Sequence, residues 1–388
     1  MTVQIGLETL LKEQRAVIAG QRLGLIAAAA SVDAQLVNSI ERLHAEPGIR
    51  LTALYGPEHG VRGAAQAGEH VTTQRDPVTG LPAYSLYGAT VKPDADMLAE
   101  VDTLLYDLQD GGLRFFTFLS TLVYVLQAAA EHGKRVIVLD RPVFLGGEVI
   151  EGNLLQPGYE SMVGVYPLPI RYGMTAGEIA QMLNATQSIG CDLTVVPMRG
   201  WTRSRWFDQT GLPFVPPSPN LPTLTAFNAY PGTCLIEGTT LSEGRGTTKP
   251  FEYMGAPFVD AHRLAQALNA LDLPGVRFRP VYFVPTFSKW QGETCGGVHL
   301  YITERATFQP VATALHIIAT ARALYPEQAG WRDPWSEGGL LPIDLLTGGA
   351  QVRQHFDDQR PVRELLESWQ ADLAAFAEQR QPFLLYAK

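Results

Sequence analysis

Short apolar segments that alternate with helical patterns constrain the first part of the chain most strongly. The apolar segments are predicted strands and comprise residues 22–30, 50–56, 102–107 and 134–140. Between them, residues 32–44 and 116–133 have helical periodicity. Parallel strands need a crossover helix and are buried on both faces, so this alternation indicates a parallel sheet. Residues 1–150 are therefore predicted to form a Rossmann-like, doubly wound domain of the α/β class.

The pattern changes after Val149. The next predicted strands, at residues 193–197, 276–283 and 297–303, are joined by a few helices and by long loops rich in proline and glycine. The tail from Pro361 to Gln379 has the pattern of an amphipathic helix. A chain of 388 residues is long enough for two domains. We therefore expect residues 151–388 to form a mixed α+β domain that contributes substrate-binding loops.

Composition argues against several classes of protein. The formal net charge of -9 disfavours a nucleic-acid binder, which would need a basic face. No apolar run reaches the ~18 residues of a membrane span, and the N-terminus has no signal-peptide pattern. A cytoplasmic location is expected for the sequence as given, and a secreted one if a signal has been trimmed from it.

Neither a metal nor a cofactor is predicted. The three cysteines, Cys191, Cys234 and Cys295, are far apart in the sequence, and the histidines form no HExxH pattern. No GxGxxG motif follows the first predicted strand, so the loop that would hold a dinucleotide phosphate is missing.

Polar residues follow three of the predicted parallel strands. These segments are Gly56–Gly63, Asp107–Arg114 and Asp140–Pro142, and each contains a carboxylate and an arginine. Ligands of doubly wound sheets bind beyond the carboxyl ends of the strands. The sequence therefore predicts a binding site at this edge of the sheet.

A second set of polar loops lies later in the chain. Glu237–Phe251 holds two glutamates, one arginine, five hydroxyl side chains and three glycines. Pro216–Pro222 precedes it, and Pro285–Gly297 follows it. Glycines allow backbone amides to approach a ligand, and a carboxylate beside a guanidinium supplies an acid-base group and an anion clamp. A solvated surface turn is the alternative.

Four motifs carry a resemblance to a known family. They are Gly56-Pro-Glu-His-Gly60, Tyr106-Asp-Leu-Gln-Asp-Gly111, Pro216-Pro-Ser-Pro-Asn220 and the segment from Glu237 to Thr248. With these motifs the chain resembles the bacterial exo-β-N-acetylmuramidases, formerly classed as a domain of unknown function. The resemblance implies a two-domain glycosidase, one domain Rossmann-like, that removes N-acetylmuramic acid from the non-reducing ends of peptidoglycan fragments. The substrate would be a muramyl sugar or muropeptide.

The chain departs from the family pattern at two places. The family tends to carry a Thr-Asn pair after the first strand and a histidine before Gly173-Met-Thr175. This chain has Ala27–Ala30 and Tyr172 at these positions. Both departures bear on substrate preference more than on fold.

Hydrolysis of a glycosidic bond usually takes two carboxyl groups, one that donates a proton and one that is ionised. We expect Glu58 to be the general acid, because it follows a buried strand where desolvation would keep it protonated; pairing with Arg62 is the alternative. Glu243 is the preferred second carboxylate, exposed on a flexible backbone and kept ionised by Arg245. His59 would orient Glu58 or bind substrate, or else be structural. The other candidates for the second carboxylate are Glu237, Asp110 and Glu151.

Glu237, Asp110 and Glu151 also have other expected roles. Glu237 would bond to sugar hydroxyls, Asp110 would orient the acid, and Glu151 would belong to the domain hinge.

Muramic acid differs from glucosamine by a lactyl ether that ends in a carboxylate. A guanidinium binds such a group bidentately, and the candidates are Arg62, Arg114, Arg171 and Arg245. Asn220 and Lys289 are expected to bind the acetamido group and hydroxyls. Trp290 and Tyr172 would stack on a sugar face, although aromatic residues are more often part of a core.

Two other functions stay open from sequence alone. One is a non-catalytic muropeptide-binding or sugar-binding protein on the same fold. The other, a serine hydrolase, is disfavoured because no Gly-x-Ser-x-Gly motif follows a strand.

Overall fold

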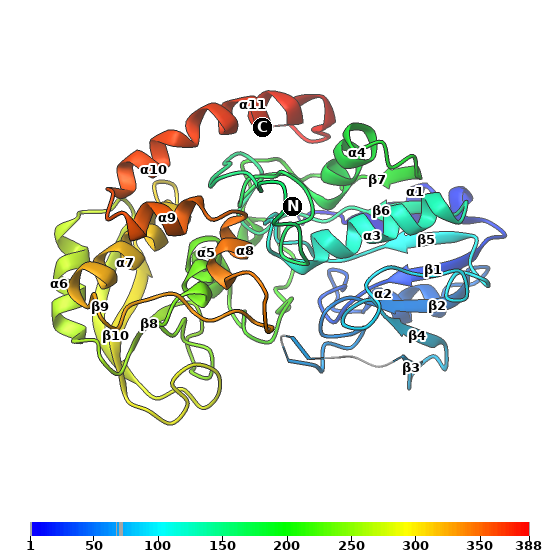
Figure 1. Cartoon of the computed structure of the whole chain (residues 1–388). Helices are drawn as coiled ribbons and strands as arrows, with labels where there is room; N and C mark the ends of the chain where they lie inside the picture. Colours follow the sequence, from blue (N-terminus) through cyan, green and yellow to red (C-terminus); the bar gives the residue numbers. More distant parts are fainter. Residues whose placement is uncertain (1, 67, 70–72, 388) are drawn as a thin grey trace. The chain divides into compact units, whose positions relative to one another are not determined.

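A computed structural model describes residues 2–66, 68–69 and 73–387. The chain divides into two compact units (Figure 1). The first consists of Met1–Val149, Tyr172–Pro219 and Ala377–Lys388, and the second of Ile150–Arg171 and Asn220–Phe376.

A seven-stranded sheet forms the centre of the first unit (Figure 1). Its strands, in chain order, are β1 (Arg22–Ile26), β2 (Arg50–Gly56), β3 (Gln74–Arg75), β4 (Pro82–Ser85), β5 (Thr103–Tyr106), β6 (Arg135–Leu139) and β7 (Asp192–Val196). Their order in the sheet is β3-β4-β2-β1-β5-β6-β7. All neighbours pair in parallel except β3, which is antiparallel to β4. Without β3, this is the 3-2-1-4-5-6 order of a Rossmann fold, so the predicted α/β class is confirmed.

The strand predicted at residues 193–197 belongs to this sheet. It was expected among the strands of the second domain, but Asp192–Val196 pairs in parallel with β6 over its full length. The segment between β6 and β7 is long, so their pairing could not be predicted from local patterns in the sequence.

Helices cover both faces of the large sheet. They are α1 (Gly6–Glu13), α2 (Ser39–His44), α3 (Thr117–Glu131) and α4 (Ala176–Thr186), with 3₁₀ turns η1 (Arg15–Ile18), η2 (Phe207–Gln209) and η4 (Gln381–Phe383). Apolar side chains of α1 and α2 share one core cluster with Leu105 and other strand residues. Tyr106 points to the opposite face, since successive strand residues alternate, and its hydroxyl donates to the carbonyl of Phe118 in α3. The sheet is therefore doubly wound.

The second unit contains an antiparallel sheet of three strands, β8 (Tyr253–Ala256), β9 (Val276–Phe283) and β10 (Cys295–Ile302), in the order β8-β10-β9. Its helices are α5 (Leu224–Thr233), α6 (Ala261–Ala270), α7 (Pro310–Leu324), α8 (Pro342–Thr347), α9 (Gln351–Asp357) and α10 (Val362–Ser368), with the 3₁₀ turn η3 (Cys234–Gly238). The helix α11 (Gln370–Arg380) begins in this unit and ends in the first. The single helix predicted at 361–379 is thus two helices, with a break at Trp369.

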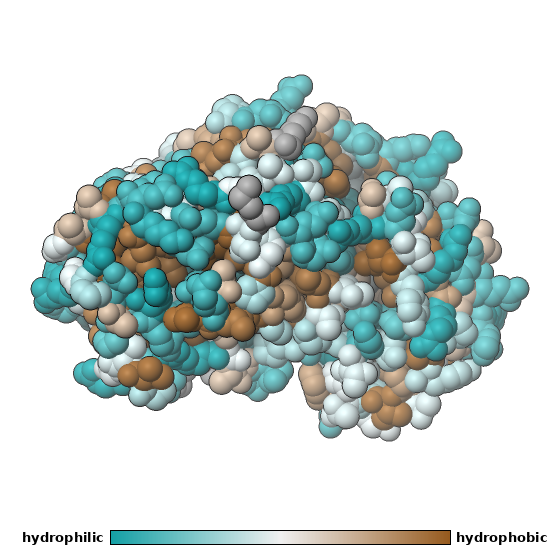
Figure 2. Space-filling view, turned by 180° about the vertical axis from the view of Figure 1, so that it is seen from behind, coloured by the Kyte–Doolittle hydropathy of each residue, from teal (hydrophilic) through white to brown (hydrophobic). Residues whose placement is uncertain are grey.

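The surface mixes polar and apolar areas. Hydrophilic residues cover much of the face seen in Figure 2, with smaller hydrophobic patches between them. Exposed large apolar side chains include Tyr282, Val284 and Tyr301. Among the described residues, no helix combines the length and the apolar character that crossing a membrane would require.

Candidate active site

Glu58 lies in the turn that follows β2, at the carboxyl edge of the large sheet. Its side chain is half-buried. The hydroxyl of Thr117 donates a 2.7 Å hydrogen bond to Oε2, and the backbone amide of Gly68 donates a 3.0 Å bond to Oε1. Burial, together with the nearby Glu58 carboxylate, raises the pKa of Tyr87 above its usual range. Glu58 is thus held by hydrogen bonds from Thr117 and Gly68, and Tyr87 lies near it.

His59 is bound to its own turn. Its backbone has a φ of 73°, in the left-handed region, and its side chain is buried. Nδ1 lies 2.9 Å from the carbonyl oxygen of Ala65 and donates to it. This contact stabilises the turn, which matches the structural alternative for His59. Its role toward Glu58 stays a prediction.

Arg62 forms ion pairs with carboxylates other than Glu58. Its Nε and Nη2 donate to Asp76 at 2.7 and 2.9 Å, and its Nη1 donates to Glu41 at 2.5 Å. The Arg62 guanidinium holds the pKa of the buried Asp76 carboxyl far below its usual range. The predicted alternative for Glu58, a pairing with Arg62, is therefore not what the structure shows. Arg62 instead ties the turn to α2 and to the segment before β4.

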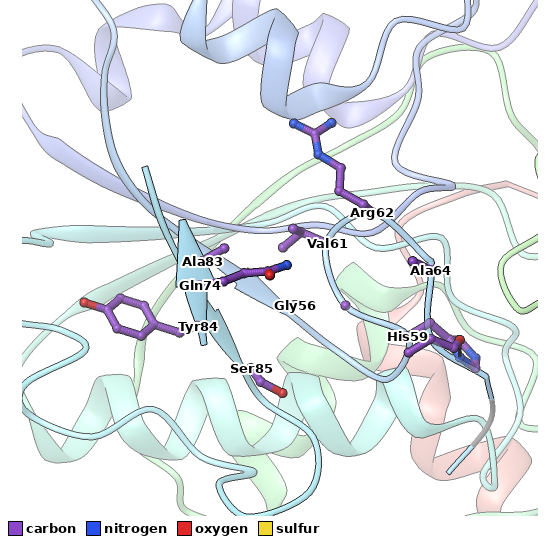
Figure 3. A pocket seen from close by; sticks show the side chains of 11 residues that line it. Gly56, His59, Val61, Arg62, Ala64, Gln74, Ala83, Tyr84 and Ser85 are labelled. Atoms are coloured by element: carbon purple, nitrogen blue, oxygen red, sulfur yellow. Dashed lines mark hydrogen bonds between the residues drawn. The ribbon is translucent and has the colours of Figure 1, made fainter. Parts of the chain in front are cut away.

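A recess of about 290 Å³ lies beside this turn, between the ends of β2 and β4 (Figure 3). Much of its lining consists of small residues, namely Gly56, Gly60, Ala64, Ala65 and Ala83. Val61, Gln74 and Ser85 also line it. In Figure 3 the Arg62 guanidinium points away from Gln74 and Ser85. The recess gives the first unit a hollow on the same turn that carries Glu58.

Asp110, which follows β5, is buried. Its Oδ1 accepts hydrogen bonds from the Gly112 amide at 2.8 Å and from the Tyr172 hydroxyl at 3.2 Å. Burial raises the pKa of Asp110 to about 6. Arg114, four residues later, is also fully buried, and burial lowers its pKa to about 9.

Tyr172 is fully buried as well. Its hydroxyl bonds to Asp110, and its carbonyl oxygen accepts from Arg380 at 3.1 Å. The ring therefore packs inside the protein and has no exposed face for a sugar. The expectation that Tyr172 stacks on a sugar is corrected in favour of a core position.

The topological switch point of the sheet, between β1 and β5, is occupied by an internal ion pair. Arg141 donates to both oxygens of Asp107, at 2.7 and 2.8 Å, and to the carbonyl of Val32 at 2.8 Å. Both charged side chains are buried. A Rossmann fold often binds its ligand at this point, but here Asp107 and Arg141 connect the ends of three strands.

Four charged side chains of the second unit form one cluster. Glu243 lies 3.3 Å from Arg245 Nε and 2.9 Å from Lys289 Nζ, and Glu237 lies 3.0 Å from Arg245 Nη2. Lys289 also donates to the carbonyls of Ile236 and Thr239 at 2.9 and 3.0 Å. The cluster contains two carboxylates and two cations, so its formal charge is balanced.

Glu243 is buried, with 1% of its side chain exposed. The expectation of an exposed carboxylate on a flexible backbone is therefore wrong: the loop around it packs inward. Burial acts to raise the pKa of Glu243, but the positive charges of Lys289 and Arg245 outweigh it and lower the pKa. This direction agrees with the expected effect of Arg245 on Glu243, whose catalytic role stays a prediction.

One nitrogen of Arg245, Nη1, is buried and has no hydrogen-bond partner among the residues that the structure describes. Nε and Nη2 lie beside the two glutamates. The guanidinium lies over the ring of Phe251, 5.0 Å from its centroid. Trp290, close to this cluster in sequence, donates from Nε1 to the Thr240 carbonyl at 2.8 Å.

Glu151 binds the beginning of α7. Its Oε1 accepts from the amides of Val311 and Ala312 at 2.8 and 3.3 Å, where the helix N-cap, Gln309, makes no side-chain cap. Burial raises the pKa of Glu151 and lowers the pKa of Arg171 to about 10. The two residues also exchange backbone hydrogen bonds of 2.9 Å.

Asn220, the residue expected to bind the acetamido group or hydroxyls, is buried. Its role in binding stays a prediction.

The structure brings the predicted site residues together in two separate groups. Glu58, His59 and Arg62 share one turn of the first unit, and Glu237, Glu243, Arg245 and Lys289 share one cluster of the second. Thr117 and Tyr87, the neighbours of Glu58, were not predicted. For Thr117, the sequence feature that could have indicated a contact was its position at the start of the helix predicted at 116–133. Within the described part of the chain, no three His, Cys, Asp or Glu residues are grouped as metal ligands.

Two family models match nearly the whole chain. The N-terminal model of the exo-beta-N-acetylmuramidase NamZ matches residues 23–225, and the C-terminal model matches residues 228–386. A curated relative, the peptidoglycan beta-N-acetylmuramidase NamZ of Bacillus subtilis strain 168, is 48% identical over 384 residues. This match covers 99% of the chain and 91% of the relative.

Two crystal structures of DUF1343 family proteins from Bacteroides fragilis NCTC 9343 are similar to the chain. One is 38% identical with a TM-score of 0.91 and covers 99% of both chains. The other is 28% identical with a TM-score of 0.76 and covers 100% of both chains.

Proposed function

Because the chain belongs to the exo-β-N-acetylmuramidase family, as its motifs predicted, and is thus a glycosidase, we propose that it releases N-acetylmuramic acid from the non-reducing ends of peptidoglycan fragments. The curated relative is a peptidoglycan beta-N-acetylmuramidase, and its high identity supports the same substrate class here. A muramyl sugar or muropeptide is therefore the proposed ligand.

Glu58 is the proposed proton donor to the leaving oxygen. The observation that carries this assignment is its position: a half-buried carboxyl at the carboxyl edge of the sheet, fixed through both oxygens by Thr117 and Gly68. Catalytic groups of doubly wound proteins lie at this edge. A general acid must also be held within reach of one atom of the substrate, and the two hydrogen bonds fix its orientation.

In the second unit, Arg245 is the proposed ligand of the lactyl carboxylate. Arg62 is occupied by Asp76 and Glu41, and Arg114 and Arg171 are buried, with 0% and 3% of their surface exposed. Arg245 is partly exposed, with 15% of its side chain accessible, and keeps its charge, since the neighbouring glutamates outweigh burial and raise its pKa. Glu243 and Glu237 would then hold the guanidinium in place.

The chromogenic β-linked N-acetylmuramide and N-acetylglucosaminide of nitrophenol test this function together. The wild type should hydrolyse the muramide alone, and hydrolysis of the glucosaminide at an equal rate would contradict the substrate. The proton donor is tested on a disaccharide of N-acetylmuramic acid linked β-1,4 to N-acetylglucosamine, because its sugar leaving group needs a proton whereas nitrophenolate does not. On the disaccharide Glu58→Gln should reduce kcat by at least ~100-fold, the scale of general acid catalysis, and an active variant would contradict the proton donor.

A two-carboxylate mechanism also needs an ionised partner. The variants Asp110→Asn and Glu243→Gln test the two buried candidates. The partner is identified when its variant loses as much kcat as Glu58→Gln and regains activity with added azide. A variant that loses stability but keeps kcat has only a structural role.

A further inference from the structure

Thr117 is the first residue of α3, so its hydroxyl has no helical carbonyl three or four residues earlier to bond to. Helical threonines often bond back to the carbonyl three or four residues earlier. Thr121, one turn later in α3, does so, with its hydroxyl 3.2 Å from the carbonyl of Thr117. Thr117 is the first residue of α3 and donates instead to Glu58, 59 residues earlier in the sequence, at 2.7 Å.

The beginning of α3 also has properties that favour a contact with the Glu58 carboxylate. Phe116 is the N-cap and supplies no side-chain hydrogen bond to the first turn. The amino end of a helix carries a partial positive charge, which attracts a carboxylate. The Thr117 hydroxyl is therefore the side-chain donor that this end of α3 presents to Glu58.

We infer that Thr117 is a positioning residue for Glu58, holding its carboxyl group in one orientation and supporting the charge that forms on it during proton donation. This inference rests on the proposed function of Glu58. A hydroxyl can donate to a carboxylate and can also accept from a carboxylic acid. One contact thus serves Glu58 both before and after it gives up its proton.

The contact should act on the transition state more than on substrate binding. A hydrogen bond to an ionised group is stronger than one to a neutral group. As the proton moves to the leaving oxygen, negative charge develops on Glu58, and the bond from Thr117 strengthens. Interactions that strengthen in the transition state raise kcat and leave KM nearly unchanged.

The neighbouring Tyr87 supports this view of the site. Burial, and then the charge of Glu58, raise its pKa, so the phenol stays protonated and is a second group near the carboxyl. The hydrogen bond from Thr117, at 2.7 Å, is shorter than the one from the Gly68 amide, at 3.0 Å.

Kinetics of the enzyme on the disaccharide of N-acetylmuramic acid linked β-1,4 to N-acetylglucosamine test the inference, because its sugar leaving group needs the proton that Glu58 would supply. Thr117→Val keeps the shape of the side chain and removes the hydroxyl, and we expect kcat to fall about tenfold, the value of one hydrogen bond of ~1.4 kcal/mol, with KM within about twofold. Loss of a donor favours protonated Glu58. The limb of the pH-rate profile that reports ionisation of Glu58 should therefore move to higher pH.

Three further variants complete the test. Thr117→Ser retains the hydroxyl and should restore both kcat and the pH profile. Thr121→Val is the matched control, because it removes a hydroxyl of the same helix that bonds only to a helix carbonyl, and its kinetics should equal those of the wild type. If Thr117→Val does not fold, Thr117→Ala replaces it, and the same changes in kcat, KM and pH profile are expected.

The outcomes separate this inference from the proposed function. A Thr117→Val enzyme with the wild-type kcat and pH profile, beside an inactive Glu58→Gln, overturns the positioning role and leaves the acid assignment intact. Lower thermal stability with an unchanged pH profile overturns it as well, because that result is what a purely structural contact gives. An active Glu58→Gln variant contradicts the acid assignment on which this inference rests.

Discussion

Lys289 Nζ lies 2.9 Å from Glu243 Oε2, with 12% and 1% of the two side chains exposed. Lys289 also donates to two backbone carbonyls, so its ammonium group has two hydrogen-bond acceptors beside the ion pair with Glu243. Removal of one partner of such a buried pair leaves the other charge without compensation. The pair is therefore a structural centre of the loop that carries the family's longest motif.

The first prediction concerns this pair. Lys289→Met should lower the free energy of unfolding by about 3 kcal/mol, because Glu243 would lose one of its two cations. Urea denaturation measures the change. The exposed pair Arg277–Asp272, with side chains 57% and 83% exposed, offers the control: Arg277→Met should cost at most about 1 kcal/mol. Equal costs for the two variants would show that Lys289 is not part of a buried network.

The second prediction is a pH dependence at Asp110. Burial raises its pKa in the folded state from 3.8 to about 6, so the folded protein binds a proton more tightly than the unfolded chain. The resulting stabilisation is complete below about pH 4 and is lost as the pH rises through 6. Relative to Asp110→Asn, the wild type should lose about 2 kcal/mol of stability between pH 4 and 7. Urea denaturation of both proteins across this range measures it, and a difference that does not change with pH would contradict burial as the cause.

The third prediction separates two roles for Arg62. The structure gives it two carboxylate partners, Asp76 and Glu41, so Arg62→Met should lower the free energy of unfolding by about 2 kcal/mol. The KM for the muramide should change by less than about threefold. Thermal unfolding and steady-state kinetics provide the two readings. A large rise in KM with unchanged stability would instead assign Arg62 to the substrate.

The fourth prediction concerns the beginning of α7. Glu151 accepts from two amides of the first turn, in place of an N-cap side chain. Glu151→Ala should therefore cost about 1–2 kcal/mol in unfolding free energy, as the loss of a helix cap does. Glu304→Ala, at an exposed loop position, serves as the control and should stay within about 0.5 kcal/mol of the wild type. An unchanged stability of Glu151→Ala would contradict the capping role.

Sequence reasoning succeeded where local pattern decides the structure. The buried strand before Glu58 is a continuous apolar run, so its end, and the position of Glu58 beyond it, could be predicted. The charged loop around Glu243 was also recognisable from its residues. Its burial was not, because Lys289, which neutralises Glu243, comes from a segment more than forty positions away.

The contacts that fix the site depend on distant parts of the chain. Thr117 and Glu58 are 59 residues apart, and Arg62 binds Asp76 and Glu41, which flank it on either side of the sequence. The exposure of Tyr172 was misjudged for the same reason, since its hydroxyl meets Asp110 from a segment 62 residues later. Periodicity describes single elements, and these contacts arise only once the sheet has formed.

The most direct test of the proposed function uses two disaccharides that differ only in the order of their sugars. One carries N-acetylmuramic acid at the non-reducing end, linked β-1,4 to N-acetylglucosamine, and the other has the reverse order. Product analysis by liquid chromatography and mass spectrometry should show cleavage of the first alone, with release of free N-acetylmuramic acid, and loss of that cleavage in Glu58→Gln. Cleavage of the second disaccharide, or of neither by a folded enzyme, would contradict an exo-acting muramidase.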